Sequence, residues 1–270
     1  MRHTAFLWGA VVAVVVVLQL TVGHLSAELF ALPLNLLVMA LWLVGVWWLA
    51  RHRHTSNVAS MLHSMEATWF SLALLVVLGI AFGVQYKPAT TSFLALASLL
   101  FVMTHLTLIT LRGARNGVGQ WRWSFLLNHC GLLLALVAGF WGSADRREWR
   151  VVVAREPVEQ MVYTSSGSPS HIEYPMWLRG LRTEHFDNGT LAFSEALVDV
   201  DGCEVSLQVN RPYNRTWYET IYLTGYDTAT ASEARYVTLE VVRDWWRWPK
   251  FAGIVMLILG ALMMFTGRNE

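Results

Sequence analysis

Long apolar runs alternate with short polar segments through the first half of the chain, and one more run lies near its end. Most runs approach the roughly 20 residues that an α-helix needs to cross a bilayer. The pattern predicts six transmembrane helices, over residues 5–20, 32–50, 68–84, 92–111, 124–141 and 251–265. A cleaved signal peptide is an alternative for the first run, but its apolar core exceeds the usual length of about 7–15 residues. A retained helix is therefore favoured.

Between the fifth and sixth runs the pattern changes to short segments rich in Val, Tyr, Thr and Trp. They predict strands over residues 149–154, 159–164, 176–186, 190–198, 203–210, 216–224 and 236–242. Asp187-Asn188-Gly189 and Asp201-Gly202 have the composition of hairpin turns. The fold expected is a membrane protein with an antiparallel β-sandwich or barrel-like domain inserted before its last helix.

Four parts follow from this reading. They are a two-helix hairpin with a basic cytoplasmic loop (residues 1–63), a three-helix membrane core (64–142), a β-rich domain (143–248), and a last helix with a short tail (249–270). Trp141, Trp149, Trp245, Trp246 and Trp248 flank the β-rich part. Tryptophan is enriched where spans meet water, so these residues predict an aromatic belt.

Charge is distributed unevenly and predicts an orientation. Residues 143–248 hold 16 of the 19 acidic residues and 11 arginines, a balance of −5. With the N-terminus inside, the inner segments hold Arg2, Arg51, Arg53, Arg112, Arg115, Arg122 and Arg268, and the short outer flanks hold Lys87 and Lys250. Positive residues favour the cytoplasmic side, so both termini are expected in the cytoplasm and the β-rich part outside it. The basic patch that nucleic-acid binding needs is not evident.

Few chemical motifs are present. Cys130 falls in a predicted span and Cys203 in the β-rich part, so a disulfide between them is not expected. The chain has no CxxC, P-loop, HExxH or nucleophile elbow, and no catalytic residue is predicted.

Of the nine histidines, only His105 and His129 lie within predicted spans. Ionisable residues inside a bilayer are costly and mark functional sites. His105 lies seven residues before Arg112, and His129 six residues after Trp123, so both are about 10 Å from the cytoplasmic side at the helical rise. Two imidazoles at one depth suit axial ligation of haem. The alternatives are a histidine hydrogen-bonded to a neighbouring helix, and half of a haem site completed by another subunit.

Five segments, in order, resemble the ResB/CcsB family of bacterial cytochrome c biogenesis, from Ser64 to the C-terminus. They are SMEATWFSLALLVVLGIAFG, FLLNHCGLLLALVAGFWG, YPMWLRGLRTEHFDNG, VNRPYNRTWYETIYLTGYD and LEVVRDWWRWPKFAGIVMLILG. The matching positions in the last two segments are Asn210, Pro212, Tyr222, Tyr226, Asp227, Arg243 and Asp244. Trp245 replaces the family's proline, and His129 occupies the place of its histidine, whereas His105 has no such counterpart.

The resemblance implies a subunit of a system II cytochrome c synthase in the bacterial inner membrane, with its large domain in the periplasm. It implies a CcsA/ResC-type partner, an apocytochrome c and haem b, transported or transiently bound, with His129 as an axial ligand to the haem iron. His105 is the weaker candidate. Two alternatives stay open: a b-type cytochrome that uses both histidines for electron transfer, and a membrane anchor without a cofactor.

Overall fold

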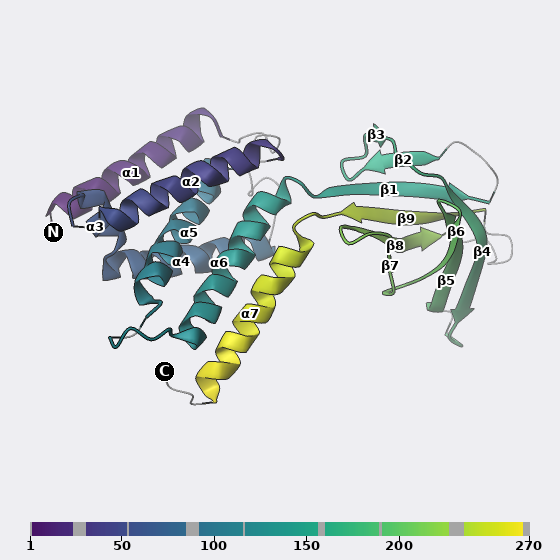
Figure 1. Cartoon of the computed structure of the whole chain (residues 1–270). Helices are drawn as coiled ribbons and strands as arrows, with labels where there is room; N and C mark the ends of the chain where they lie inside the picture. The colour runs from purple at the N-terminus through teal and green to yellow at the C-terminus, as the bar shows by residue number, and fades with distance from the viewer. Residues whose placement is uncertain are drawn as a thin grey trace. The chain divides into compact units, whose positions relative to one another are not determined.

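The computed structural model describes residues 2–23, 31–52, 54–84, 92–115, 117–155, 160–188, 191–226 and 235–266. The chain forms two compact units (Figure 1). One comprises Met1–Asp145 and Trp246–Glu270 and is helical, and the other, Arg146–Trp245, is built from strands. Each unit is described separately below.

Each predicted apolar run forms a helix, except that residues 32, 33 and 92 lie just before the first helical residue. The helices are α1 (Arg2–Thr21), α2 (Leu34–Arg51), α3 (Asn57–Leu62), α4 (Met65–Val84), α5 (Phe93–Gly113), α6 (Trp123–Ser143) and α7 (Arg247–Phe265). By length and hydropathy, α2, α5, α6 and α7 are long enough to cross a membrane. The described apolar parts of the other two, Val12–Thr21 and Met65–Ile80, are shorter. The structure thus supports membrane spans at four of the six predicted positions, and the number six stays a prediction.

Helix α3 lies where only a basic loop is expected from the sequence. Ser56 caps it by accepting a hydrogen bond from the Ala59 backbone N–H. Its Met61 and Leu62 are buried, and Leu62 packs with Leu108 of α5. With only six residues, α3 is too short to show a helical period in the sequence.

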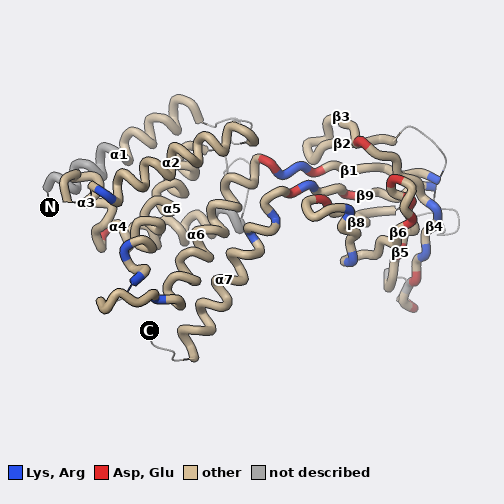
Figure 2. The backbone as a smooth tube through the Cα atoms, in the orientation of Figure 1, with Lys and Arg blue, Asp and Glu red and all other residues tan. Residues whose placement is uncertain are grey.

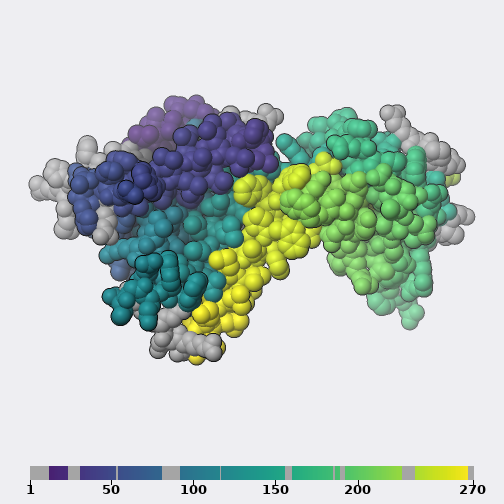
Figure 3. All heavy atoms as spheres, viewed as in Figure 1, coloured from purple at the N-terminus to yellow at the C-terminus, as the bar shows by residue number. Residues whose placement is uncertain are grey.

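Helices α6 and α7 pack closely through glycines. A Cβ on Gly253 would lie 2.8 Å from the Gly131 carbonyl oxygen, and one on Gly131 would lie 2.8 Å from the Gly253 oxygen. Small residues let two helices approach this closely. Apolar side chains stay exposed along the rest of α7, from Phe251 to Phe265, as expected of a surface that faces lipid (Figure 3).

Asp145 joins the ends of three helices within the helical unit. It is 8% exposed, and its carboxylate accepts hydrogen bonds from the Leu32 N–H (2.7 Å), Asn35 Nδ2 (2.8 Å) and Trp246 Nε1 (2.7 Å). Three donors compensate a buried charge that has no cation beside it among these contacts. Trp246 is therefore held in the protein, and Trp141 is only 1% exposed. The predicted aromatic belt is wrong at Trp141, because its side chain is buried instead of facing lipid.

The β unit contains two antiparallel sheets, as the alternation of its residues predicts. The strands are β1 (Arg147–Ala154), β2 (Met161–Thr164), β3 (Pro169–Ser170), β4 (Met176–His185), β5 (Leu191–Val200), β6 (Cys203–Gln208), β7 (Tyr213–Asn214), β8 (Glu219–Tyr226) and β9 (Tyr236–Arg243). One sheet has the order β3-β2-β1-β9-β8-β7 and the other β4-β5-β6.

The two sheets share one apolar core. Val151 and Leu239 from the larger sheet and Met176, Val198 and Leu207 from the smaller sheet are fully or almost fully buried in it. This arrangement is a β-sandwich, one of the two architectures predicted. Charged residues are common on the strands and sparse along the helices (Figure 2).

One predicted hairpin turn is confirmed. Asp201 and Gly202 have positive φ values of 55° and 80° and connect β5 to β6 in a two-residue loop. Such a turn suits aspartate and glycine because it requires the left-handed region at both positions. The other predicted turn reaches Gly189, which lies outside the described residues.

Candidate functional site

A cavity of about 330 Å³ lies among α4, α5 and α6, with Leu257 of α7 in its wall. Its lining is mostly leucine, isoleucine and valine. The polar residues in the lining are Thr68, Ser71, His105, Asn128 and His129. The structure thus brings the two histidines of the predicted spans to one cavity, although they lie on different helices.

His129 is half-buried, on the second turn of α6. Its Nδ1 lies 2.9 Å from the backbone oxygen of Phe125, one turn earlier, and its ring stacks on the Phe125 ring with centroids 3.8 Å apart. A carbonyl oxygen only accepts, so Nδ1 carries a proton, and in the neutral imidazole Nε2 carries the lone pair. Nε2 has no hydrogen-bond partner among the described residues.

The position of Phe125 depends on the end of α5. A Cβ at Gly113 would collide with the Phe125 ring, so a glycine at this position leaves room for it. The guanidinium carbon of Arg122 also lies near Phe125, 4.9 Å from its ring centroid. Gly113 and Arg122 therefore restrict the position of the Phe125 ring, and the stacking contact in turn restricts the orientation of the His129 imidazole.

His105 differs from His129 in its partners. It is only 3% exposed, its Nδ1 lies 2.8 Å from the Leu62 oxygen of α3, and its Nε2 lies 3.2 Å from Thr68 Oγ1 of α4. Nδ1 must donate to the carbonyl, so the Nε2 lone pair accepts from the threonine hydroxyl. Both ring nitrogens are occupied by protein groups. His105 therefore links three helices, and it would have to break one bond to bind a metal ion.

The cavity suits one axial ligand better than two. A neutral imidazole whose Nδ1–H is held by a carbonyl presents Nε2 to a metal in the orientation that metal-binding histidines usually have. The volume is at the lower end of the roughly 300–1,000 Å³ usual for ligand pockets, so a macrocycle as large as haem would be only partly enclosed. The residues present fit one side of a haem site. No group of three or more His, Cys, Asp or Glu side chains gathers as a metal site in the part of the chain that the structure describes.

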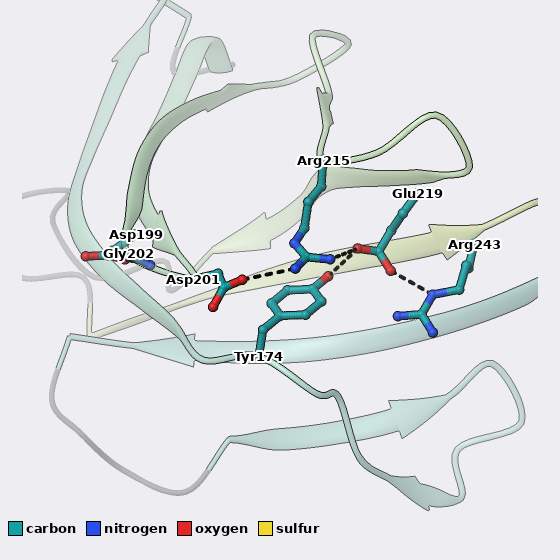
Figure 4. A network of polar contacts seen from close by, with 7 residues as sticks. All are labelled: Tyr174, Asp199, Asp201, Gly202, Arg215, Glu219 and Arg243. Atoms are coloured by element: carbon teal, nitrogen blue, oxygen red, sulfur yellow. Dashed lines mark hydrogen bonds and ion pairs between the residues drawn. The ribbon is translucent and has the colours of Figure 1, made fainter.

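A second polar cluster, in the β unit, was not predicted from the sequence (Figure 4). Glu219 is 0% exposed and accepts hydrogen bonds from the Tyr174 hydroxyl (2.9 Å), Arg215 Nη1 (3.1 Å) and Arg243 Nε (2.8 Å). Arg215 also bonds Asp201, and its guanidinium carbon lies 3.9 Å from the centroid of the Tyr174 ring. Burial, followed by the charge of Glu219, raises the pKa of Tyr174, so its hydroxyl stays a donor. Each carboxylate oxygen of Glu219 is engaged, which fits a structural role.

The matching positions of the last two segments of the family resemblance lie in the β unit where they can be located. Asn210 has a φ of 65° in the turn before β7, and Tyr222 and Tyr226 lie on β8. The Arg243 side chain bonds Glu219, and the Asp244 N–H donates to the backbone oxygen of Tyr218. Asp227 lies outside the described residues.

Comparisons with known proteins give little further information. No family model and no curated protein matches the sequence. A solved structure of the cytochrome c haem lyase CcmF is similar, with 16% identity and a TM-score of 0.39 over 71% of this chain. The chain spans about a third (33%) of the length of that structure. A likeness this low assigns neither fold nor function, so the ResB/CcsB resemblance stays a prediction.

Proposed function

We propose that this chain is a haem-handling membrane subunit of a system that matures c-type cytochromes. The observation that carries the proposal is the state of His129. Its Nε2, which bears the lone pair in the neutral imidazole, has no hydrogen-bond partner among the described residues, and the residue lines a mostly apolar cavity between candidate membrane spans. The second support is the resemblance of five ordered segments to the ResB/CcsB family.

Haem is the cargo in this proposal, and its iron offers an axial position that an imidazole fills. His129 holds one side, the Phe125 carbonyl keeps the Nδ1 proton in place, and the apolar lining limits the access of water. A CcsA/ResC-type partner supplies the second axial ligand and covers the part of the haem that this cavity does not enclose. This chain contributes no catalytic residue. Haem b passes from the cytoplasmic side toward the apocytochrome, and His129 holds it on the way.

The β unit then lies on the periplasmic side of the bacterial inner membrane, with both termini in the cytoplasm. The balance of −5 over residues 143–248 suits contact with basic segments of the apocytochrome or the partner. The arginine excess of the short loops on the other side supports this orientation.

The test compares His129→Ala with His105→Ala, each co-expressed with the partner subunit. His129→Ala is expected to abolish the haem absorbance of the purified complex and the maturation of cytochrome c. His105→Ala is expected to keep the haem absorbance and to lower the thermal stability, because it removes bonds to Leu62 and Thr68. Retention of haem and maturation by His129→Ala would remove His129 from the mechanism.

One observation favours a second function, a b-type cytochrome: His105 and His129 line the same cavity. That function requires the His105 Nε2 to leave Thr68 and to bind iron. It predicts a bis-imidazole, redox-active haem in this chain purified without a partner, abolished by either substitution. The His105→Ala spectrum therefore decides between the two functions.

A further inference from the structure

Three aromatic side chains, two exposed and one half-buried, form a cluster in the β unit. Tyr218 stacks on Trp245 with ring centroids 3.9 Å apart and an interplanar angle of 10°. Trp217 meets Trp245 edge-on at 5.4 Å and Tyr218 at 5.2 Å. Trp217 is 55% exposed and Trp245 is 41% exposed. Large aromatic surfaces exposed together are unusual in water and mark a contact with something else.

The buried polar cluster holds the loop that carries Trp217. This loop, Arg215 to Tyr218, connects β7 to β8. At the start of the loop, the Arg215 side chain bonds Glu219 and Asp201. At its end, the backbone oxygen of Tyr218 accepts a hydrogen bond from the Asp244 N–H at 2.7 Å. Both ends are therefore fixed to the sheet. Trp217 is presented by a rigid loop, and its exposure is not a consequence of a loose chain.

The covalent chain sets the level of this cluster relative to a bilayer. Trp245 is two residues before Arg247, the first residue of α7, which is a candidate membrane span. Two residues extend at most about 7 Å, so the Trp245 backbone lies close to the first turn of α7, which leads into the apolar run that begins at Phe251. Trp217 touches Trp245, so it shares that level although it precedes it by 28 residues in the sequence.

We infer that Trp217, Tyr218 and Trp245 form an interfacial anchor that inserts into the headgroup region of the lipid bilayer. Tryptophan and tyrosine favour this region because their rings are apolar at one end and hydrogen-bond at the other. The anchor keeps this loop at the membrane surface. It adds a membrane contact to the β unit, which is otherwise attached through its covalent links to α6 and α7. It does not depend on haem binding or on His129.

The test places a bimane fluorophore on the loop. Trp217→Cys is made in the full chain with Cys130→Ser and Cys203→Ser, labelled, and reconstituted in nanodiscs. The matched control is Phe186→Cys in the same background, a 61% exposed aromatic outside the cluster. We expect lipids with a nitroxide on the headgroup to quench the fluorophore at 217 and not at 186. Aqueous iodide is expected to quench the fluorophore at 186 more strongly. The proposal would be overturned if only iodide quenched the fluorophore at position 217. It would also be overturned if the nitroxide lipid quenched the fluorophores at 217 and 186 equally.

A second measurement avoids the cysteine substitution. The fluorescence of Trp217→Phe is subtracted from that of the unmodified chain, and the difference isolates the emission of Trp217. Phenylalanine keeps an aromatic ring at this position. In nanodiscs of brominated lipid this difference is expected to lose most of its intensity. If the Trp217 emission has the same intensity in brominated and in ordinary lipid, the proposal is contradicted, even if the labelled cysteine variant does not fold.

Discussion

Glu219 carries a negative charge at a position that solvent does not reach. An isolated carboxylate would be strongly destabilising there, but two arginines and the Tyr174 hydroxyl supply its hydrogen bonds. Arg215 and Arg243 remain 26% and 21% exposed, so only the carboxylate loses its hydration completely. The cluster therefore depends on Glu219 more than on either arginine.

Replacing Glu219 by Gln should destabilise the β unit. The amide removes the charge and turns a donor toward one of the arginines, which leaves cations facing each other without compensation. Loss of one partner from a buried ion pair destabilises by on the order of 3 kcal/mol, or about a hundredfold in an equilibrium constant. Hydrogen exchange of β8 and β9 peptides in the full-length chain, measured by mass spectrometry, should accelerate accordingly. Exposed Glu204, changed to Gln, is the matched control and should not alter exchange.

The sequence indicates which residues are unusual but not what surrounds them. His129 could be found because it interrupts an apolar run. The difference between it and His105 could not be predicted, since the partners of His105 lie 43 and 37 residues away along the chain. The surroundings of Glu219 could not be predicted either, because Tyr174 and Arg243 lie 45 and 24 residues away from it along the chain.

At the scale of the elements, long periodic or apolar segments were predicted well. The six apolar runs are helices, and seven predicted strands correspond to β1, β2, β4, β5, β6, β8 and β9. The segments that were missed are short: β3 and β7 have two residues each. Such short strands form because a neighbouring strand offers hydrogen bonds, and this information is not local to their own sequence.

The contact between α6 and α7 leads to a prediction about Gly253. Alanine there would place a Cβ 2.8 Å from the backbone nitrogen of Ala135, which no side-chain rotation relieves. Overpacking of this kind destabilises by about 1–3 kcal/mol. Gly253→Ala is expected to lower the thermal midpoint of the far-UV circular dichroism signal in detergent micelles.

Gly139→Ala on α6 is the matched control, because no atom lies within 4 Å of the Cβ it adds. Its midpoint should stay at or above that of the unmodified chain. Equal midpoints for Gly253→Ala and Gly139→Ala would show that the two helices do not pack through Gly253. Because Leu257 lies one turn beyond Gly253 and lines the cavity, a separation of α7 from α6 should also weaken the haem binding that we propose.

At the scale of the whole molecule, charge and hydropathy divide the chain in the same way as its fold. Acidic residues concentrate in the β unit, and the charged residues of the helical unit are mostly arginines near the helix ends (Figure 2). This division was visible in the sequence because it depends on composition, summed over many residues. The order of helical and β segments could also be predicted from the sequence, but the sites within each unit depend on how the helices and the sheets pack.

The predicted orientation can be tested with the thiols that the chain already has. Cys203 is exposed on β6, and Cys130→Ser leaves it as the only thiol. Positive residues favour the cytoplasmic side, so the predicted orientation puts Cys203 outside the cytoplasm. Cys203 should then react with a membrane-impermeant maleimide in right-side-out spheroplasts and not in inverted vesicles. The matched control, Val118→Cys with both native cysteines changed to Ser, puts a thiol in the 85% exposed position between Arg115 and Arg122. It should react only in inverted vesicles. The opposite pattern would place the β unit in the cytoplasm, where it could not meet an apocytochrome outside the membrane.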